Sequence, residues 1–427
     1  MSNYDSTLRF LFDLQFFGIK VGLENIRFLI HQLGNPHSSF PSIHVAGTNG
    51  KGSTASLIAS VLIAAGYRTG LYTSPHLITF NERIRIDGRM IGDSDLVRYT
   101  KVLRPDIMRS QATFFEATTA IAFQYFADQN VDVAVIETGL GGRLDATNVI
   151  TPMLSVITNI DLDHMEYLGP TIKHIAFEKG GIMKPGVPCL TGVRNPVALE
   201  ELKRCAQRSG AKLIEASQAS RLAIGDRSLA GLRLSIRTPR HDYKDLHVSL
   251  AGDHQAGNAQ LALLAIEMVK EKMSGIRISR EHISDGFANV RRYSGLRGRF
   301  EVVRHTPLTI VDVAHNPDAV RTLVSTLGAL IGRPCLTVFG VMKDKDWPKM
   351  LALLSERSRM TIAVQPATDR ALDTRSIIHH LHASGSKALD GGIVRDAVRS
   401  AETQARRCEP ILVTGSHYVV GEALNYL

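Results

Sequence analysis

The sequence contains few cysteines, one tryptophan and no long hydrophobic run. Its 427 residues include only four cysteines, and aromatic residues make up 6% of the total. Cys189, Cys205, Cys335 and Cys408 show no paired spacing, which argues against a disulfide scaffold or a zinc ribbon. The longest apolar stretch, residues 57–66, is about half of the roughly 20 residues that a bilayer requires. We therefore expect no membrane span.

The N-terminus also lacks the pattern of a secretory signal, because Asp5, Arg9 and Asp13 interrupt its apolar residues. We expect a cytoplasmic protein. The 50 basic and 41 acidic residues give a formal charge of +9, which permits anionic partners without choosing among them. The basic residues form no long run and are not interleaved with aromatic side chains, so we expect no nucleic-acid binding.

Short apolar runs alternate with helical patterns along most of the chain. Near-continuous apolar runs are typical of strands buried on both faces of a parallel sheet, and their alternation with helices predicts an α/β fold. In residues 53–66, apolar side chains recur at a spacing near 3.6, which predicts an amphipathic helix. The predicted strands are residues 42–46, 131–136, 153–157, 187–190, 308–313, 335–341, 361–364 and 411–413.

Two segments depart from this alternation. In 222–250, Leu232, Leu234 and Ile236 alternate with polar residues, which predicts antiparallel strands with one wet face. The segment 291–304 holds five arginines against one glutamate, and the βα alternation restarts after it. We predict a domain boundary here, which divides the chain into residues 1–297 and a smaller Rossmann-like α/β domain at 298–427.

The strongest motif lies at residues 44–54, HVAGTNGKGST. An apolar strand leads into a glycine-rich turn, then Lys51, then hydroxyls at the start of a helix. Such glycines let backbone N–H groups converge on phosphate oxygens, the helix N-terminus adds its dipole, and the lysine adds a charge. Gly52 stands where the usual phosphate-loop pattern has a hydroxyl. The alternative is a glycine turn with an incidental lysine.

Three further residues follow predicted strands or helices of the first domain. Glu137 ends an apolar strand, where a nucleotide-binding protein holds a Mg²⁺ ligand, although a solvated carboxylate is the alternative. The glycines at 139–141 start a dinucleotide fingerprint that fails at Leu144, so a nicotinamide site is not favoured. His164 is a metal ligand or a hydrogen-bonded loop histidine. By its local sequence alone, Lys179 is a surface or C-capping lysine.

In the second domain, Asp312 and His315 follow a predicted strand, and Pro317 begins a helix. Open α/β sheets bind ligands at the carboxyl ends of their strands. These two residues and Arg299 are therefore candidates for a site, with packing or capping as an equal alternative.

Together these stretches resemble the bacterial folylpolyglutamate synthase/dihydrofolate synthase family of the Mur ligase superfamily. The resemblance runs through nearly the whole chain in order, and in that family's phosphate loop Gly52 is no departure. The similar stretches are residues 46–54, 72–77, 81–86, 114–119, 137–148, 162–164, 178–179, 298–300, 312–319 and 415–422.

The resemblance implies a P-loop-containing Mur-ligase-like ATPase domain with a parallel sheet, followed by a glutamate-ligase domain. It implies an ATP-dependent ligase that adds L-glutamate to dihydropteroate, to the γ-carboxylate of reduced folate polyglutamates, or to both, through an acyl phosphate. The expected partners are ATP, Mg²⁺, L-glutamate, dihydropteroate and reduced folates, with the chain acting as a monomer. Folylpolyglutamate synthase activity alone is one alternative. A Mur ligase for UDP-sugar peptides is another, but such enzymes carry an additional N-terminal domain that this chain has no room for.

The resemblance also implies roles for individual residues. Lys51, Lys179 and His315 match catalytic positions, with Lys179 carbamylated. The positions matching ATP-binding residues are Gly47, Thr48, Asn49, Gly50, Lys51, Gly52, Ser53, Thr54, Asn258, Arg299 and Asp312. The positions matching magnesium ligands are Ser53, Ser74, Glu137, His164 and the carbamylated Lys179. The positions expected around the pterin substrate are Gly22, Leu23, Glu24, Asn25, Phe115, Glu116, Ala117, Thr118, Leu144, Asp145 and Ala146.

Overall fold

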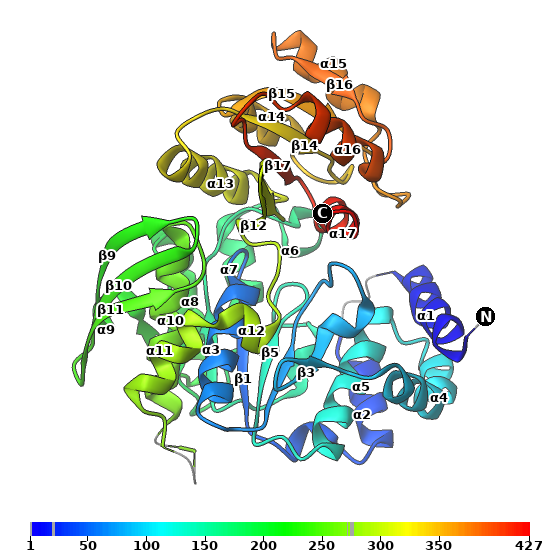
Figure 1. Cartoon of the computed structure of the whole chain (residues 1–427). Helices are drawn as coiled ribbons and strands as arrows, with labels where there is room; N and C mark the ends of the chain where they lie inside the picture. The colour runs from blue at the N-terminus through cyan, green and yellow to red at the C-terminus, as the bar shows by residue number, and fades with distance from the viewer. Residues whose placement is uncertain (1, 19–21, 271, 274–276) are drawn as a thin grey trace.

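The computed structural model describes residues 2–18, 22–270, 272–273 and 277–427. Its strands form two α/β bodies, one above the other in Figure 1, with a small antiparallel sheet beside the first. The strands are β1 (Ser42–Ala46), β2 (Thr69–Tyr72), β3 (Ile84–Ile86), β4 (Arg89–Met90), β5 (Val133–Glu137), β6 (Leu154–Ile157), β7 (Cys189–Thr191), β8 (Leu213–Glu215), β9 (Arg221–Ser228), β10 (Gly231–Arg237), β11 (Asp242–Val248), β12 (Glu301–His305), β13 (Leu308–Asp312), β14 (Cys335–Phe339), β15 (Ser358–Ala363), β16 (Ala388–Asp390) and β17 (Ile411–Thr414).

Helices cover both sheets. The α-helices are α1 (Asn3–Asp13), α2 (Glu24–Gln32), α3 (Lys51–Ala64), α4 (Asp93–Ser110), α5 (Phe114–Asp128), α6 (Met165–Leu168), α7 (Ile172–Gly180), α8 (Pro196–Ser209), α9 (Ala216–Ala219), α10 (His254–Val269), α11 (Arg280–Ala288), α12 (Val290–Ser294), α13 (Pro317–Leu330), α14 (Trp347–Ser355), α15 (Thr374–Ala383), α16 (Val394–Gln404) and α17 (His417–Leu424). Short 3₁₀ turns are η1 (Leu14–Phe17), η2 (Pro36–Ser38), η3 (Phe80–Arg83) and η4 (Ala146–Val149). None of the helices within the described ranges is long and apolar enough to cross a membrane.

The first sheet has the strand order β4-β3-β2-β5-β1-β6-β7-β8 in the described part of the chain. β1 pairs in parallel with β5 and β6, so their carboxyl ends meet at one edge. The runs predicted at 42–46, 131–136, 153–157 and 187–190 are confirmed as β1, β5, β6 and β7. The pattern missed β2, β3, β4 and β8, because these are two to four residues long and most carry charged or small residues.

The helix predicted at 53–66 is present as α3, but its predicted amphipathic character is wrong. Polar and apolar side chains are buried alike, including Ser56 and Ser60. α3 packs against α10, α11 and α12 as well as the sheet, so none of its faces is left for water. Ser60 instead donates its hydroxyl to the carbonyl of Ser56 at 2.7 Å. The phosphate loop therefore leads into a helix that is buried on nearly all sides.

The segment predicted to be antiparallel forms the small sheet β11-β10-β9. As expected, Leu232, Leu234 and Ile236 are buried, whereas Arg233 and Arg237 are exposed. The sheet packs on α10 and α11 and extends the core of the first body.

The second sheet has the order β12-β13-β17-β14-β15-β16. Its four predicted strands are confirmed as β13, β14, β15 and β17, which pair in parallel, whereas the unpredicted β12 pairs antiparallel with β13. α/β architecture is thus confirmed in both bodies. The division at residue 297 stays a prediction; the turn around it carries Gly298 at φ 68°, and the carbonyl of Gly298 accepts a hydrogen bond from the N–H of Val313.

Candidate active site

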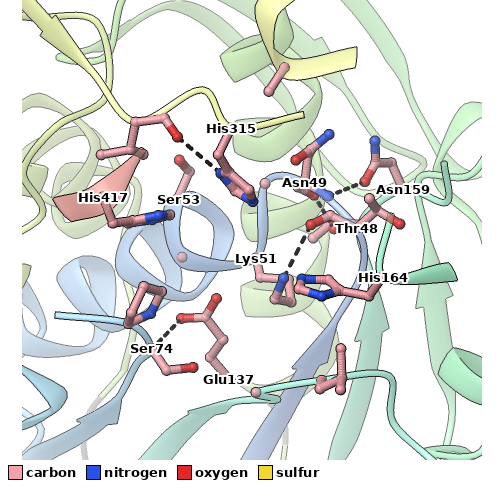
Figure 2. Close-up of a pocket in the computed structure, with 18 of the residues that line it drawn as sticks. Thr48, Asn49, Lys51, Ser53, Ser74, Glu137, Asn159, His164, His315 and His417 are labelled. Carbon is pink, nitrogen blue, oxygen red and sulfur yellow. Dashed lines mark hydrogen bonds between the residues drawn. The ribbon is translucent and has the colours of Figure 1, made fainter. Parts of the chain in front are cut away.

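A cavity of about 1510 Å³ opens where the two bodies face one another. Its walls come from the carboxyl ends of β1, β2, β5 and β6 and, in the second body, from the end of β13 and the start of α17. In Figure 2, His315 and His417 of the second body lie on one side of the pocket, and Lys51, Ser74 and Glu137 lie on the other. Both sheets therefore present their ligand-binding edges to one space.

The loop between β1 and α3 has the geometry of an anion site. Gly50, at φ 83°, leaves no room for a side chain, since a Cβ there would lie 2.5 Å from Oδ1 of Asn258. The loop is held in place by Asn159, whose Oδ1 accepts from the N–H of Asn49 at 2.6 Å (Figure 2). Lys51 begins the helix, and its Nζ donates to the carbonyl of Thr48 at 3.1 Å. Backbone N–H groups, a helix N-terminus and a cation thus meet at one point, which suits a phosphate.

Glu137 lies at the end of β5 and is 3% exposed. Burial raises the pKa of its carboxyl, while the charges of Lys51, Arg299 and Arg83 oppose this shift. Its Oε2 accepts from the N–H of Ser74 at 3.2 Å (Figure 2). A buried carboxylate with a neighbouring serine is an oxygen-rich donor set that fits Mg²⁺.

No three His, Cys, Asp or Glu side chains converge as a metal cluster within the ranges that the structure describes. Mg²⁺ commonly takes one or two carboxylates and completes its shell with water and substrate phosphates, so this finding is compatible with the ion. The residues that would hold it are Glu137, Ser74 and Ser53, all of which line the cavity.

Lys179 is buried at 4% exposure near the end of α7, so the surface or capping position favoured by its local sequence is wrong. Its Nζ donates to the carbonyl of Gly47, in the phosphate loop, at 2.8 Å. Burial and the nearby charge of Lys51 lower the pKa of Lys179 to about 7. This lowered pKa increases the neutral fraction of the amine at pH 7, and the neutral amine is the nucleophilic form.

His164 and Asp163 lie in the loop after β6, and both face the second body. Burial, with the charges of Lys345, His315 and Lys51, lowers the pKa of His164 to about 4, against the attraction of Asp163. The imidazole is therefore neutral at pH 7, which is the form that binds metals.

Asp163 joins the two bodies. It accepts hydrogen bonds from Lys345 at 2.8 Å and from Asn316 at 3.0 Å, and Nε2 of His315 lies 3.6 Å away. Burial alone would raise the pKa of the Asp163 carboxyl, but the neighbouring His315, His164 and Lys345 hold that pKa below its usual range. Asp163 is therefore an anion paired with Lys345 and hydrogen-bonded to Asn316.

The second body also reaches the phosphate loop directly. The side chain of Asn49 donates to Asp318 at 3.0 Å and accepts from Asn316 at 3.1 Å. Asp312 accepts from the N–H groups of Phe300 and Ala314, both at 2.8 Å, which fixes its carboxylate at the end of β13. The second body thus bonds to the loop through Asn316 and Asp318, whereas Asp312 is held by backbone groups of its own body.

Most of the predicted site residues border the cavity. The predicted nucleotide-binding residues on its wall are Thr48, Asn49, Gly50, Lys51, Gly52, Ser53, Asn258, Arg299 and Asp312. The predicted metal ligands and catalytic residues on its wall are Ser53, Ser74, Glu137, His164, Lys51 and His315. The predicted pterin-binding residues on its wall are Gly22, Phe115, Glu116, Leu144, Asp145 and Ala146.

Eight predicted residues do not border it: Gly47, Thr54, Lys179, Leu23, Glu24, Asn25, Ala117 and Thr118. Three of these residues make hydrogen bonds just behind the residues that line the cavity. Thr54 donates to Asn258 at 3.4 Å, Asn25 donates to Glu116 at 3.4 Å, and Lys179 holds Gly47.

Sequence reasoning missed Asp163, Lys345 and His417 as site residues. His417 is half-buried beside His315, with ring centroids 5.1 Å apart, and lines the cavity. Burial and the charges of His315 and Arg299 lower its pKa well below the usual value. The sequence carries no local signal for Lys345, which lies between β14 and α14.

Comparisons with known proteins agree with this geometry. The sequence pattern of the Mur ligase middle domain matches residues 45–266, and that of the Mur ligase glutamate ligase domain matches residues 298–417. The dihydrofolate synthase/folylpolyglutamate synthase of Bacillus subtilis (strain 168) is 36% identical over 418 residues, covering 95% of each chain.

Solved structures agree as well. The folylpolyglutamate synthase of Mycobacterium tuberculosis complexed with ADP superposes with a TM-score of 0.90 at 32% identity, covering 99% of this chain and 98% of that one. The Escherichia coli protein named FolC, in complex with DHPP and ADP, gives a TM-score of 0.86 at 30% identity, covering 98% and 97%. The chain therefore belongs to the Mur ligase family, in the branch of the folylpolyglutamate and dihydrofolate synthases.

Proposed function

We propose that this protein is an ATP-dependent ligase that joins L-glutamate to dihydropteroate, to the γ-carboxylate of reduced folate polyglutamates, or to both. The observation that carries the proposal is the single cavity in which the phosphate loop of the first body faces Asp312 and His315 of the second. Relatives with these activities in their names match along nearly the whole chain. The ADP in two related structures supports nucleotide binding by this chain.

The reaction requires a carboxylate to attack the γ-phosphate of ATP, with ADP as the leaving group, and this brings two anions together. Lys51 and the N–H groups of the loop reduce this repulsion and stabilise the charge that spreads over the transferred phosphoryl group. Mg²⁺ held by Glu137, Ser74 and Ser53 would add further positive charge there. Arg299 and Asp312, on the wall of the second body, contact ATP in this proposal, together with Asn258 from α10.

The acyl phosphate then meets the amino group of L-glutamate, and phosphate leaves as the amide forms. Water must be kept out, because it would hydrolyse the acyl phosphate. The contacts of Asp163 and Asn49 with Asn316 hold the second body over the first and support this role. We assign His315 to this side of the reaction, since its Nδ1 donates to the carbonyl of Val313 and its Nε2 faces Asp163.

Lys179 is proposed to carry a carbamate. In this modification the neutral amine attacks CO₂ and loses a proton, and the lowered pKa of Lys179 increases the neutral fraction at neutral pH. It would convert a buried cation into an anion whose oxygens, with His164, suit a second metal ion. The division of the chain at residue 297, the monomeric state and the cytoplasmic location stay predictions.

A phosphate-release assay tests the proposal. Purified protein with ATP, Mg²⁺ and L-glutamate should release phosphate only when dihydropteroate or tetrahydrofolate is added. Comparing the two acceptors also distinguishes a bifunctional enzyme from a folylpolyglutamate synthase. Release that needs neither acceptor, or none at all with either, contradicts the proposal, and release only with a UDP-sugar peptide would favour the Mur ligase alternative.

A further inference from the structure

One arginine in the wall of the cavity is buried without a carboxylate at ion-pair distance among the described residues. Arg83 ends η3 and is 8% exposed. Its Nε donates to Nδ1 of His76 at 2.8 Å, and its guanidinium carbon lies 5.1 Å from the centroid of the Phe114 ring. No carboxylate among the described residues lies within ion-pair distance of it. The two terminal nitrogens of its guanidinium are therefore left for something in the cavity.

Two other cations of this cavity do have carboxylate partners. Lys345 lies 2.8 Å from a carboxylate oxygen of Asp163, and Arg143 lies 2.9 Å from one of Glu178. Burial lowers the pKa of Arg83, but an arginine in a protein keeps its charge. A buried, unpaired guanidinium is costly, and its planar fork matches a carboxylate with two parallel hydrogen bonds. Arg83 has the properties of a receptor for a substrate carboxylate.

The neighbours of Arg83 indicate which substrate it meets. Its carbonyl accepts from the N–H of Thr73, which places it beside Ser74, where the reacting carboxylate and Glu137 belong. On its other side are Phe114 and the aromatic residues that pack around it, in the part of the cavity proposed for the aromatic end of the acceptor. Arg83 thus lies between the aromatic end and the reacting end of the acceptor.

The two acceptors differ in this middle region. Dihydropteroate has one carboxylate, which is the reacting group. A folate ends in glutamate and carries two, the reacting γ-carboxylate and a spare α-carboxylate a few bonds away. We propose that Arg83 binds the α-carboxylate of the terminal glutamate of folate acceptors and so favours folates over dihydropteroate; this rests on the proposed function.

The test compares both acceptors in Arg83→Gln. The variant should lose about 100-fold in kcat/KM for tetrahydrofolate, the scale of a lost buried charge pair, and change by less than threefold for dihydropteroate. Its KM values for ATP and L-glutamate should stay as in the wild type. Arg83→Lys keeps the positive charge but lacks the planar guanidinium, so its kcat/KM for tetrahydrofolate should lie between those of the wild type and Arg83→Gln. Arg109→Gln is the matched control, because Arg109 also covers a phenylalanine, Phe28 at 4.6 Å, but is 62% exposed and outside the cavity.

A second measurement needs no variant. An acceptor whose terminal glutamate is replaced by 4-aminobutyrate lacks only the α-carboxylate. Wild-type protein should use it about 100-fold less well than the glutamate form, and Arg83→Gln should not distinguish the two.

Equal losses for both acceptors, a raised KM for L-glutamate, or equal use of the 4-aminobutyrate acceptor by the wild type would each overturn the proposal. A wild-type protein that uses dihydropteroate but no folate would overturn it as well. If the wild type glutamylates folates only, the 4-aminobutyrate comparison decides. Failure of the proposed function is recognised separately, as wild-type protein that releases phosphate with neither acceptor.

Discussion

Replacing Lys179 by methionine should stabilise the protein at neutral pH and abolish its activity. A lysine whose pKa falls from 10.5 in the unfolded chain to about 7 in the fold takes up its proton less readily when folded. This penalty lowers the free energy of unfolding by its full amount below pH 7, and it disappears as the pH rises past 10.5. The penalty amounts to about 4 kcal/mol at pH 7 and about 1 kcal/mol at pH 10.

Methionine fills a similar volume and carries no charge, so Lys179→Met removes this penalty. It also removes the hydrogen bond from Nζ to the carbonyl of Gly47, which offsets the gain by about 1 kcal/mol. We expect a net gain of about 3 kcal/mol at pH 7 and little or none at pH 10. The assay is thermal or urea denaturation in CO₂-free buffer at both pH values, beside phosphate release with tetrahydrofolate, which should fall to background.

The control is Lys173→Met, the same substitution at an exposed position of α7. Its free energy of unfolding should stay within about 0.5 kcal/mol of the wild-type value at either pH, and its turnover should be unchanged. The reasoning is refuted if Lys179→Met is no more stable than the wild type at pH 7, or if its gain is the same at pH 7 and pH 10. Near-normal turnover in Lys179→Met would refute the carbamate.

Three further perturbations test the site and its support. Glu137→Gln should raise the Mg²⁺ concentration needed for half-maximal phosphate release by tenfold or more, as expected for a lost carboxylate ligand; an unchanged requirement contradicts the assignment. Asp163→Asn should increase hydrolysis of ATP uncoupled from ligation, because it weakens the hold of the first body on Lys345, and the ratio of phosphate to amide product measures this. Gly286→Ala should destabilise the protein by about 1–3 kcal/mol in urea denaturation, since the new Cβ would lie 2.7 Å from the backbone of Val61.

The parts of the site that follow strands could be predicted from the sequence. The stretch 44–54, Glu137 and Asp312 each combine a buried apolar run with a distinctive turn, and neighbouring residues alone determine such local structure. Parallel pairing then brings these strand ends together, so that predicting the strands also predicts which residues share an edge.

The rest depends on contacts between distant segments. Lys345 and Asp163 are 182 residues apart, and no pattern near either residue records that they meet. The local sequence of Lys179 is that of an ordinary helix end, and its burial arises only when α7 packs beneath the phosphate loop. The prediction that α3 is amphipathic failed for the same reason, because the helices that cover its polar residues come from residues 254–294.

The hydrogen bonds from Asn49 to Asn316 and Asp318 have a thermodynamic consequence. A residue of the ATP-binding loop is bonded to the body that carries the other half of the site, so nucleotide affinity and the position of that body share one equilibrium. Coupling of this kind is reciprocal. Any acceptor that draws the second body onto the first must increase the affinity for ATP by the same factor by which ATP increases the affinity for the acceptor. The enzyme therefore binds its nucleotide most tightly when all the reactants are present.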